Sequence, residues 1–258
     1  KVTAKVAEDH IGKAHVIERV LDQLLPAAYQ KAITAAKKTP ITHPEFRLVS
    51  AELGQDWTVE AEYALLPTID LKDYKKNVTA GKKAAAKAAD DIKKEAKKAD
   101  AKAKDGKESA KPAPAPTPEQ EKEQQLQYIF RELVLGMKPQ VPELLLKHET
   151  QHEFEHLVGQ LKQLNLTVDQ YLEKRNSNMD QLSQELAVQT LNRLQLDLIL
   201  GAIARQEKLS ITDADREKHF AQIPDEAQRK RFKNDAHYLG HLDTALIKQK
   251  VVDFLLTL

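Results

Sequence analysis

The stretch MDQLSQELAVQTLNRLQLDLILGAIARQE, residues 179–207, decides the fold, because it predicts one long helix. Its large apolar side chains recur at the spacing of a single helix face. These side chains are Leu182, Leu186, Leu191, Leu194, Leu198 and Ile203. A chain that contains such a helix is expected to be mostly α-helical.

Helical patterns also fill the rest of the chain after Glu119. Two helices are expected to begin at capping boxes, T-V-D-Q at residues 167–170 and T-D-A-D at residues 212–215. The predicted helices cover residues 121–137, 142–164, a short stretch from 167, 179–207, a stretch from 212 that stops before Pro224, 225–233 and 235–256. We therefore predict that residues 119–258 form one multi-helix domain.

The first 76 residues predict a small α+β domain. Their pattern gives a strand at residues 1–6, a helix at 13–37 and a hairpin at 46–65 with its turn at 54–56. Pro26 lies inside the helical pattern, so a kink or a break is expected just before it. The predicted order is strand, helix, strand, strand.

Residues 77–118 differ in composition from both flanking regions. Residues 82–104 are almost entirely Ala, Lys, Asp and Glu, with Ile92 as the single large apolar side chain. A helix with this composition has no apolar stripe to bury. Residues 106–118, G-K-E-S-A-K-P-A-P-A-P-T-P, favour an extended spacer. The predicted fold class is α+β, mostly α: an N-terminal domain at 1–76, a linker at 77–118 and a helical domain at 119–258.

Composition excludes several classes of function. Forty basic residues face thirty-nine acidic ones, so the net charge of +1 gives no field that would recruit nucleic acid or a membrane. The chain has no cysteine, which excludes disulfides, thiol nucleophiles and cysteine-ligated zinc. No apolar run is long enough to span a bilayer, and no signal peptide precedes the first predicted strand. We expect a cytoplasmic protein.

One motif suggests metal chemistry. H-E-T-Q-H at residues 148–152 matches the zinc-hydrolase pattern, with His148 and His152 as ligands and Glu149 as the base. His156 adds a third histidine at the same spacing, but three histidines in one straight helical row cannot surround an ion. His148, His152 and His156 are therefore weak metal candidates, and a zinc hydrolase is a remote alternative.

Other catalytic signatures are missing from the sequence. It contains neither G-x-G-x-x-G nor G-x-x-x-x-G-K-[ST], and no G-x-S-x-G serine elbow. We expect no cofactor and no catalytic residues, so the protein is not expected to be an enzyme.

The order of several short strings resembles the trigger factor family. VLDQLLPAAYQKAI at 20–33, PITHPEF at 40–46 and LLPTIDLKDY at 65–74 are similar to its ribosome-binding domain. The family's C-terminal substrate-binding domain is matched by VPELL at 141–145, LTVDQYL at 166–172, LILGAIA at 198–204 and ITD at 211–213. The resemblance covers most of the chain outside the linker.

Two departures from the family pattern bear on function. Trigger factors usually carry an FKBP-like prolyl isomerase between these regions, where this chain has the Ala/Lys- and Pro-rich linker. Isomerase activity is therefore expected to be absent. The family's ribosome-docking loop, G-F-R-x-G-K, is also missing, because Val6 leads almost directly into Lys13. Either ribosome docking is lost, or a segment that carries the loop is absent from this sequence, and we favour the second explanation.

The resemblance implies an ATP-independent chaperone that holds nascent or unfolded polypeptides on apolar helical surfaces. The implied partners are such polypeptides and the ribosome, with no sequence-specific nucleic acid and no membrane, and a homodimer is left open. The candidate substrate contacts are Leu144, Leu145, Phe154, Leu157, Phe220, Tyr238 and Leu242. For each of them ordinary helix packing is the favoured alternative, since a helical apolar stripe is usually packed. The main alternative is a helical adaptor that binds one folded partner.

Overall fold

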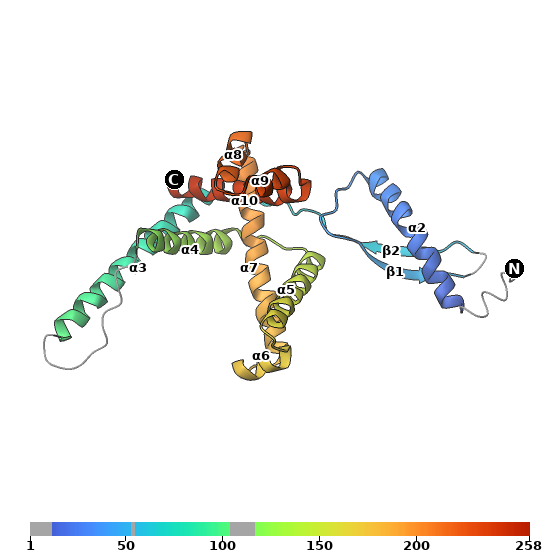
Figure 1. Ribbon diagram of the computed structural model, residues 1–258, viewed down its shortest axis with the longest axis horizontal. Helices are drawn as coiled ribbons and strands as arrows, with labels where there is room; N and C mark the ends of the chain where they lie inside the picture. The colour runs from blue at the N-terminus through green and yellow to red at the C-terminus, as the bar shows by residue number, and fades with distance from the viewer. Residues whose placement is uncertain (1–11, 53–54, 104–116) are drawn as a thin grey trace. The chain divides into compact units, whose positions relative to one another are not determined.

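A computed structural model describes residues 12–52, 55–103 and 117–258 (Figure 1). These residues form nine helices and one two-stranded sheet, which confirms the predicted fold class. In chain order they are α2 (Lys13–Ala36), β1 (Glu45–Ser50), β2 (Thr58–Glu62), α3 (Tyr74–Ala103), α4 (Pro118–Met137), α5 (Glu143–Gln163), α6 (Val168–Arg175), α7 (Met179–Gln206), α8 (Asp213–Ala221), α9 (Glu226–Lys233) and α10 (Ala236–Thr257).

The chain divides into two compact units, and each is assembled from two separate stretches. Unit 1 comprises residues 1–67 and 141–190, and unit 2 comprises residues 68–140 and 191–258. The division falls inside α7. The sequence predicted consecutive domains instead, and the predicted boundaries at 76 and 118 stay a prediction.

The core of unit 2 joins four helices that are distant in sequence. Its least exposed large side chains are Tyr74 and Val78 from α3, Ile129 and Leu133 from α4, Ile199 and Ile203 from α7, and Val251 and Leu255 from α10. The Tyr74 hydroxyl donates to Glu207 Oε1 at 2.5 Å. Burial, and after it this hydrogen bond, raises the pKa of Tyr74 well above its usual range. The start of α3 is therefore fixed by both apolar and polar contacts.

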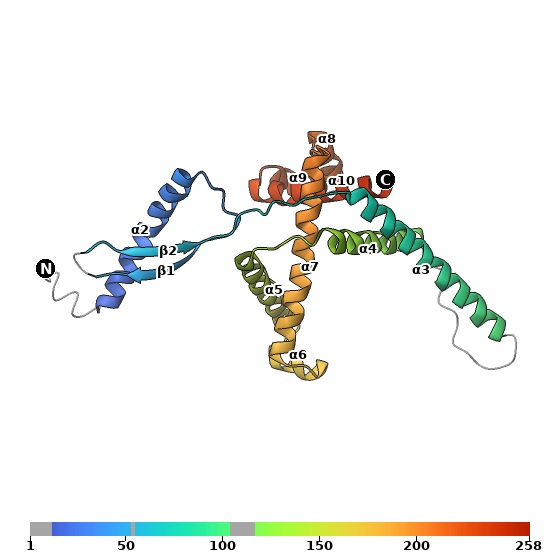
Figure 2. The ribbon, with the colours of Figure 1, turned by 180° about the vertical axis from the view of Figure 1, so that it is seen from behind.

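Helices α3 and α4 lie side by side in unit 2, as both ribbon views show (Figures 1 and 2). A Cβ atom on Gly81 would lie 2.5 Å from the backbone Cα of Ile129, so the two helices meet there at backbone distance. Gly81 lies directly before residues 82–104, the stretch that was expected to have no apolar stripe to bury. Glycine and alanine let two helices pack closely without large apolar side chains.

Unit 1 contains α2 and a hairpin. Helix α2 is continuous from Lys13 to Ala36, so of the kink or break expected before Pro26 the break does not occur. Pro26 is exposed, and on that side water can satisfy the carbonyl that loses its helical partner. Strands β1 and β2 pair antiparallel, with Phe46 opposite Ala61 and Leu48 opposite Val59. The strand predicted at residues 1–6 and part of the predicted turn lie outside the described residues.

The predicted capping boxes are present at both helix starts. Thr167 Oγ1 accepts from the Gln170 amide at 3.2 Å, and Gln170 Oε1 accepts from the Thr167 amide at 3.0 Å. At α8, the Thr212 amide donates to Asp215 Oδ2 at 2.8 Å. These bonds satisfy backbone N–H groups that have no partner inside the helix, which fixes where α6 and α8 begin.

Two ion pairs tie α8 to α10 in unit 2. Arg216 Nε lies 2.7 Å from Asp243 Oδ1, and Arg216 Nη2 lies 2.7 Å from Asp243 Oδ2, so the ion pair is bidentate. Lys250 Nζ lies 2.6 Å from Asp215 Oδ2. The hydrogen bond from Arg216 lowers the pKa of Asp243, and the one from Lys250, followed by those from Thr212, lowers the pKa of Asp215.

The backbone contact at Gly81 predicts an unusual response to alanine. In an open helix, Gly→Ala raises the free energy of unfolding by about 0.5–1 kcal/mol. Gly81→Ala should instead lower it by about 1–3 kcal/mol, because α3 and α4 must move apart. Gly240→Ala, in α10 with nothing within 4 Å of the added Cβ, is the control and should stabilise. Urea unfolding, monitored by circular dichroism, measures the free energy of unfolding of both variants. If Gly81→Ala stabilised the protein as much as Gly240→Ala does, the close packing would be contradicted.

The α8–α10 ion pairs predict a defined pH dependence. The folded pKa of Asp243 lies below its unfolded value, so its contribution to stability is present above pH about 4 and is lost as pH falls through the folded pKa. Asp243→Asn should lower Tm at pH 7, and the difference from the parent should shrink below pH 4. Glu123→Gln, at an exposed site on α4, should change Tm little at any pH. A difference for Asp243→Asn that does not depend on pH would argue against the ion pair.

Candidate functional site

An open groove runs between α5 and the first half of α7 in unit 1. It has a volume of about 460 Å³. Its walls are Glu143, Leu146, Lys147, Thr150, Gln151 and Phe154 from α5, and Met179, Ser183, Leu186 and Ala187 from α7. The α5 residues recur at helical intervals of three and four, so they lie on one face of that helix. This face lines the groove from Glu143 to Phe154.

The floor of the groove is apolar, and one polar atom in it has no partner. Met179 is 45% exposed, so an apolar side chain at the groove is open to solvent. The hydroxyl of Thr150 is buried without any hydrogen-bond partner. A buried hydroxyl without a partner costs free energy.

Charged groups lie at one end of the groove. Lys147 Nζ is 2.8 Å from Glu45 Oε1, and His148 Nε2 is 2.9 Å from the same oxygen. The hydrogen bond from Lys147, and after it the one from His148, holds the pKa of the Glu45 carboxyl below its ordinary value of 4.5. This carboxylate links β1 to α5 within unit 1.

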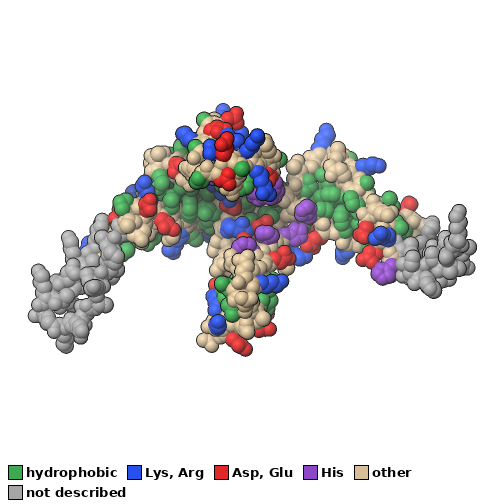
Figure 3. Space-filling view, in the orientation of Figure 1, with side chains coloured by type: hydrophobic (Ala, Val, Ile, Leu, Met, Phe, Trp, Pro, Cys, Tyr) green, Lys and Arg blue, Asp and Glu red, His purple; other side chains and the backbone are tan. Residues whose placement is uncertain are grey.

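Unit 1 has a second apolar groove, of about 340 Å³, between α2 and the hairpin. It is lined by Leu21, Leu24, Leu25, Ala28, Tyr29, Ala32, Phe46, Trp57, Val59 and Ala61. Leu24 is 62% exposed, and Figure 3 shows hydrophobic side chains open on the surface among charged ones. The Tyr29 ring meets Phe46 edge-on at 5.7 Å, and burial raises the pKa of its hydroxyl, which has no partner. This groove offers the same kind of surface as the first.

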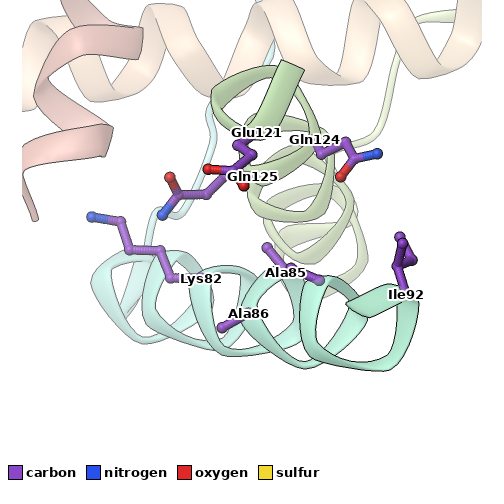
Figure 4. Close-up of a pocket in the computed structure, with 8 residues that line it drawn as sticks. Lys82, Ala85, Ala86, Ile92, Glu121, Gln124 and Gln125 are labelled. Carbon is purple, nitrogen blue, oxygen red and sulfur yellow. The ribbon is translucent and has the colours of Figure 1, made fainter. Parts of the chain in front are cut away.

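A smaller hollow of about 200 Å³ lies between α3 and α4 in unit 2 (Figure 4). The short side chains of Ala85 and Ala86 leave it open on the α3 side, and Glu121 and Gln125 border it on α4. Lys82 at its edge donates to the backbone oxygen of Leu256 at 2.8 Å. With amide and carboxylate groups on the α4 side, the hollow is more polar than the grooves of unit 1.

The seven predicted substrate contacts fall into two separate groups. Leu144, Leu145, Phe154 and Leu157 lie on α5 in unit 1, whereas Phe220, Tyr238 and Leu242 lie in unit 2. Leu144, Phe220 and Leu242 are buried, with exposed fractions of 6%, 2% and 6%. The other four are partly exposed, and Phe154 lines the α5–α7 groove. Their contact with a substrate stays a prediction.

Sequence reasoning missed several groove residues. Leu146 lies two turns before Phe154 on the same face of α5, and Met179 begins α7 opposite them. The eight-residue spacing from Leu146 to Phe154 was a usable signal. Nothing in the sequence marked Met179, because its place depends on how α7 packs against α5.

The H-E-T-Q-H motif lies on α5 without a metal-type cluster around it. The ring of His148 is already bonded to Glu45, while His152 and His156 are exposed. Across residues 12–52, 55–103 and 117–258, no three His, Cys, Asp or Glu side chains are grouped to hold an ion. In the same part of the chain, no helix has the length and apolar character needed to cross a membrane.

Comparison with known proteins points to one family. A family model described as "Bacterial trigger factor protein (TF)" matches residues 1–99, and another described as "Bacterial trigger factor protein (TF) C-terminus" matches residues 116–257. Only residues 100–115 lie between the two matches. None of the solved structures matches the chain.

Curated relatives carry the same name. Trigger factor of Carboxydothermus hydrogenoformans is 30% identical over 122 residues, 45% of this chain and 28% of that protein. Trigger factor of Mycobacteroides abscessus is 40% identical over 73 residues, 28% of this chain and 15% of that protein. The aligned part of the chain thus spans well under a third of these relatives. Because the C-terminal family model covers more than half of the 258 residues, the chain belongs to the bacterial trigger factor family, in a form with no isomerase domain between the two matched regions.

Proposed function

We propose that this protein is an ATP-independent chaperone that holds nascent or unfolded polypeptides on apolar surfaces in the cytoplasm. The observation that carries the proposal is the open α5–α7 groove, where Phe154 and Met179 line a space that the described residues of unit 1 leave open. Membership of the trigger factor family supports a chaperone role. By resemblance, the ribosome is the proposed partner that delivers nascent chains.

The chemistry of the groove suits a client of varied sequence. Leu146, Phe154 and Leu186 can each take an apolar client side chain, and full burial of such a side chain is worth about 1.5–3 kcal/mol. A few such contacts hold a segment weakly and without sequence preference, so the client is released without ATP.

The second groove extends the proposed binding surface. Leu24 and Phe46 leave apolar area open between α2 and the hairpin, again in unit 1. Of the predicted contacts, we propose Phe154, Leu145, Leu157 and Tyr238 as client contacts. The buried Leu144, Phe220 and Leu242 then act by holding the helices that present the surface.

Suppression of aggregation tests the groove directly. A chemically unfolded, unrelated protein is diluted into buffer without ATP, and light scattering is followed at increasing concentrations of this protein. The parent should reduce scattering. The double variant Phe154→Ser and Met179→Ser should need about tenfold more protein for the same effect, because about 1.4 kcal/mol of binding is lost.

A matched variant separates the groove from general surface hydrophobicity. Leu135→Ser with Ile92→Ser removes two apolar side chains that are 52% and 49% exposed on α4 and α3, outside unit 1. It should suppress aggregation as well as the parent does. Circular dichroism confirms that both variants keep their helices. No suppression by the parent at excess would favour the adaptor that binds one folded partner.

We also propose that the protein lacks prolyl isomerase activity. The sixteen residues at 100–115 are too short to form a separate domain between the family regions. A substrate whose refolding is limited by proline isomerisation should therefore refold at its uncatalysed rate, over tens to hundreds of seconds. Acceleration at catalytic concentrations would contradict this part of the proposal.

A further inference from the structure

Two histidines near the start of α10 face each other, outside the two apolar grooves of unit 1. His237 Nε2 and His241 Nε2 are 3.2 Å apart, and their ring centroids are 4.4 Å apart with planes at 69°. Both side chains are exposed on unit 2. We propose that this pair binds one divalent late transition metal ion, such as Zn²⁺, Ni²⁺ or Cu²⁺.

The distance between the two nitrogens matches chelation. Zinc–imidazole bonds are about 2.0–2.1 Å, so two nitrogens on one tetrahedral ion lie about 3.3–3.4 Å apart. The separation of His237 Nε2 and His241 Nε2 is 3.2 Å, so an ion can enter with small ring rotations. Imidazole is a preferred ligand of all three metals.

The hydrogen bond between the rings must be exchanged for two metal bonds. The Nε2–H group of one ring donates a hydrogen bond to Nε2 of the other ring. This bond occupies only the lone pair of the accepting nitrogen. When the ion binds, the donor ring moves its proton to Nδ1, and both Nε2 lone pairs then bind the metal. Neither the total number of protons nor any oxidation state changes. Water fills the remaining positions, because the described residues hold no cluster of three ligands.

The first turn of α10 is held in place before any ion binds. Asp235 Oδ1 accepts from the backbone N–H groups of His237 and Tyr238, at 3.0 and 3.1 Å. The Tyr238 ring stacks on Phe232 with centroids 4.2 Å apart. A cation near a helix N-terminus is opposed by the helix dipole, and the carboxylate of Asp235 offsets that repulsion. The ligands are therefore preorganised, which reduces the entropy cost of binding.

The histidine row on α5 differs in one respect. Nε2 of His148 is already 2.9 Å from Glu45 Oε1, so an ion would have to displace that contact. His152 and His156 are exposed at the same spacing as the α10 pair, and they supply the matched control. The two pairs allow one experiment to locate the ion.

Titration calorimetry of the untagged protein with Zn²⁺ should show saturable binding of one ion per chain at the α10 pair. His241→Ala should raise Kd at least about tenfold, because chelation is lost. His152→Ala should leave that binding unchanged. Bound Cu²⁺ should show hyperfine coupling to two imidazole nitrogens in the parent and in His152→Ala, but not in His241→Ala.

Three results would overturn the proposal. They are an absence of saturable binding, binding that survives His241→Ala with the same Kd, and binding that is lost in His152→Ala instead. Circular dichroism of His241→Ala controls for loss of the fold. The exposure of that side chain predicts an unchanged spectrum.

Discussion

The packing of the start of α3 against α4, α7 and α10 is the contact on which the rest of the structure depends. Tyr74 and Val78 are almost fully buried in that core, and the Tyr74 hydroxyl is fixed on Glu207. A segment that follows the hairpin is thereby built into the same core as the last helix of the chain. Because Gly81 lets α3 and α4 meet at backbone distance, a helix made mostly of alanine and lysine can join this core. Without that contact the segment would have the linker character that its composition suggests.

The sequence predicted the helices well and the packing of α3 poorly. Threonine caps, proline positions and apolar periodicity are local signals, which is why the start of α6 and both ends of α7 and α8 were predicted to within about two residues. Residues 77–103 carry no such apolar periodicity. The burial of α3 depends instead on its close approach to α4, a helix that comes later in the sequence, and no local pattern reports that approach. Pro26 shows the same limit, since the local rule allowed a break and helix α2 continues through the proline.

The candidate site was predicted only in part. Helical spacing marked Phe154 as apolar and periodic, and it does line the groove. The same spacing marked Leu144, Phe220 and Leu242, which are buried. Periodicity identifies an apolar face, but it does not tell whether another helix covers that face. Leu145, Leu157 and Tyr238 are intermediate, so exposure has to be read from the packed helices and not from the pattern of residues.

The alternation of the chain between its two units has a consequence for synthesis on the ribosome. The chain crosses from one unit to the other at residues 67–68, 140–141 and 190–191. When residue 140 leaves the exit tunnel, unit 1 still lacks α5, α6 and the first half of α7. Unit 2 cannot close before α10 is made. Neither unit can therefore fold as a finished domain while the next one is being made. A protein proposed to shelter incomplete chains must itself pass through incomplete states during its own synthesis.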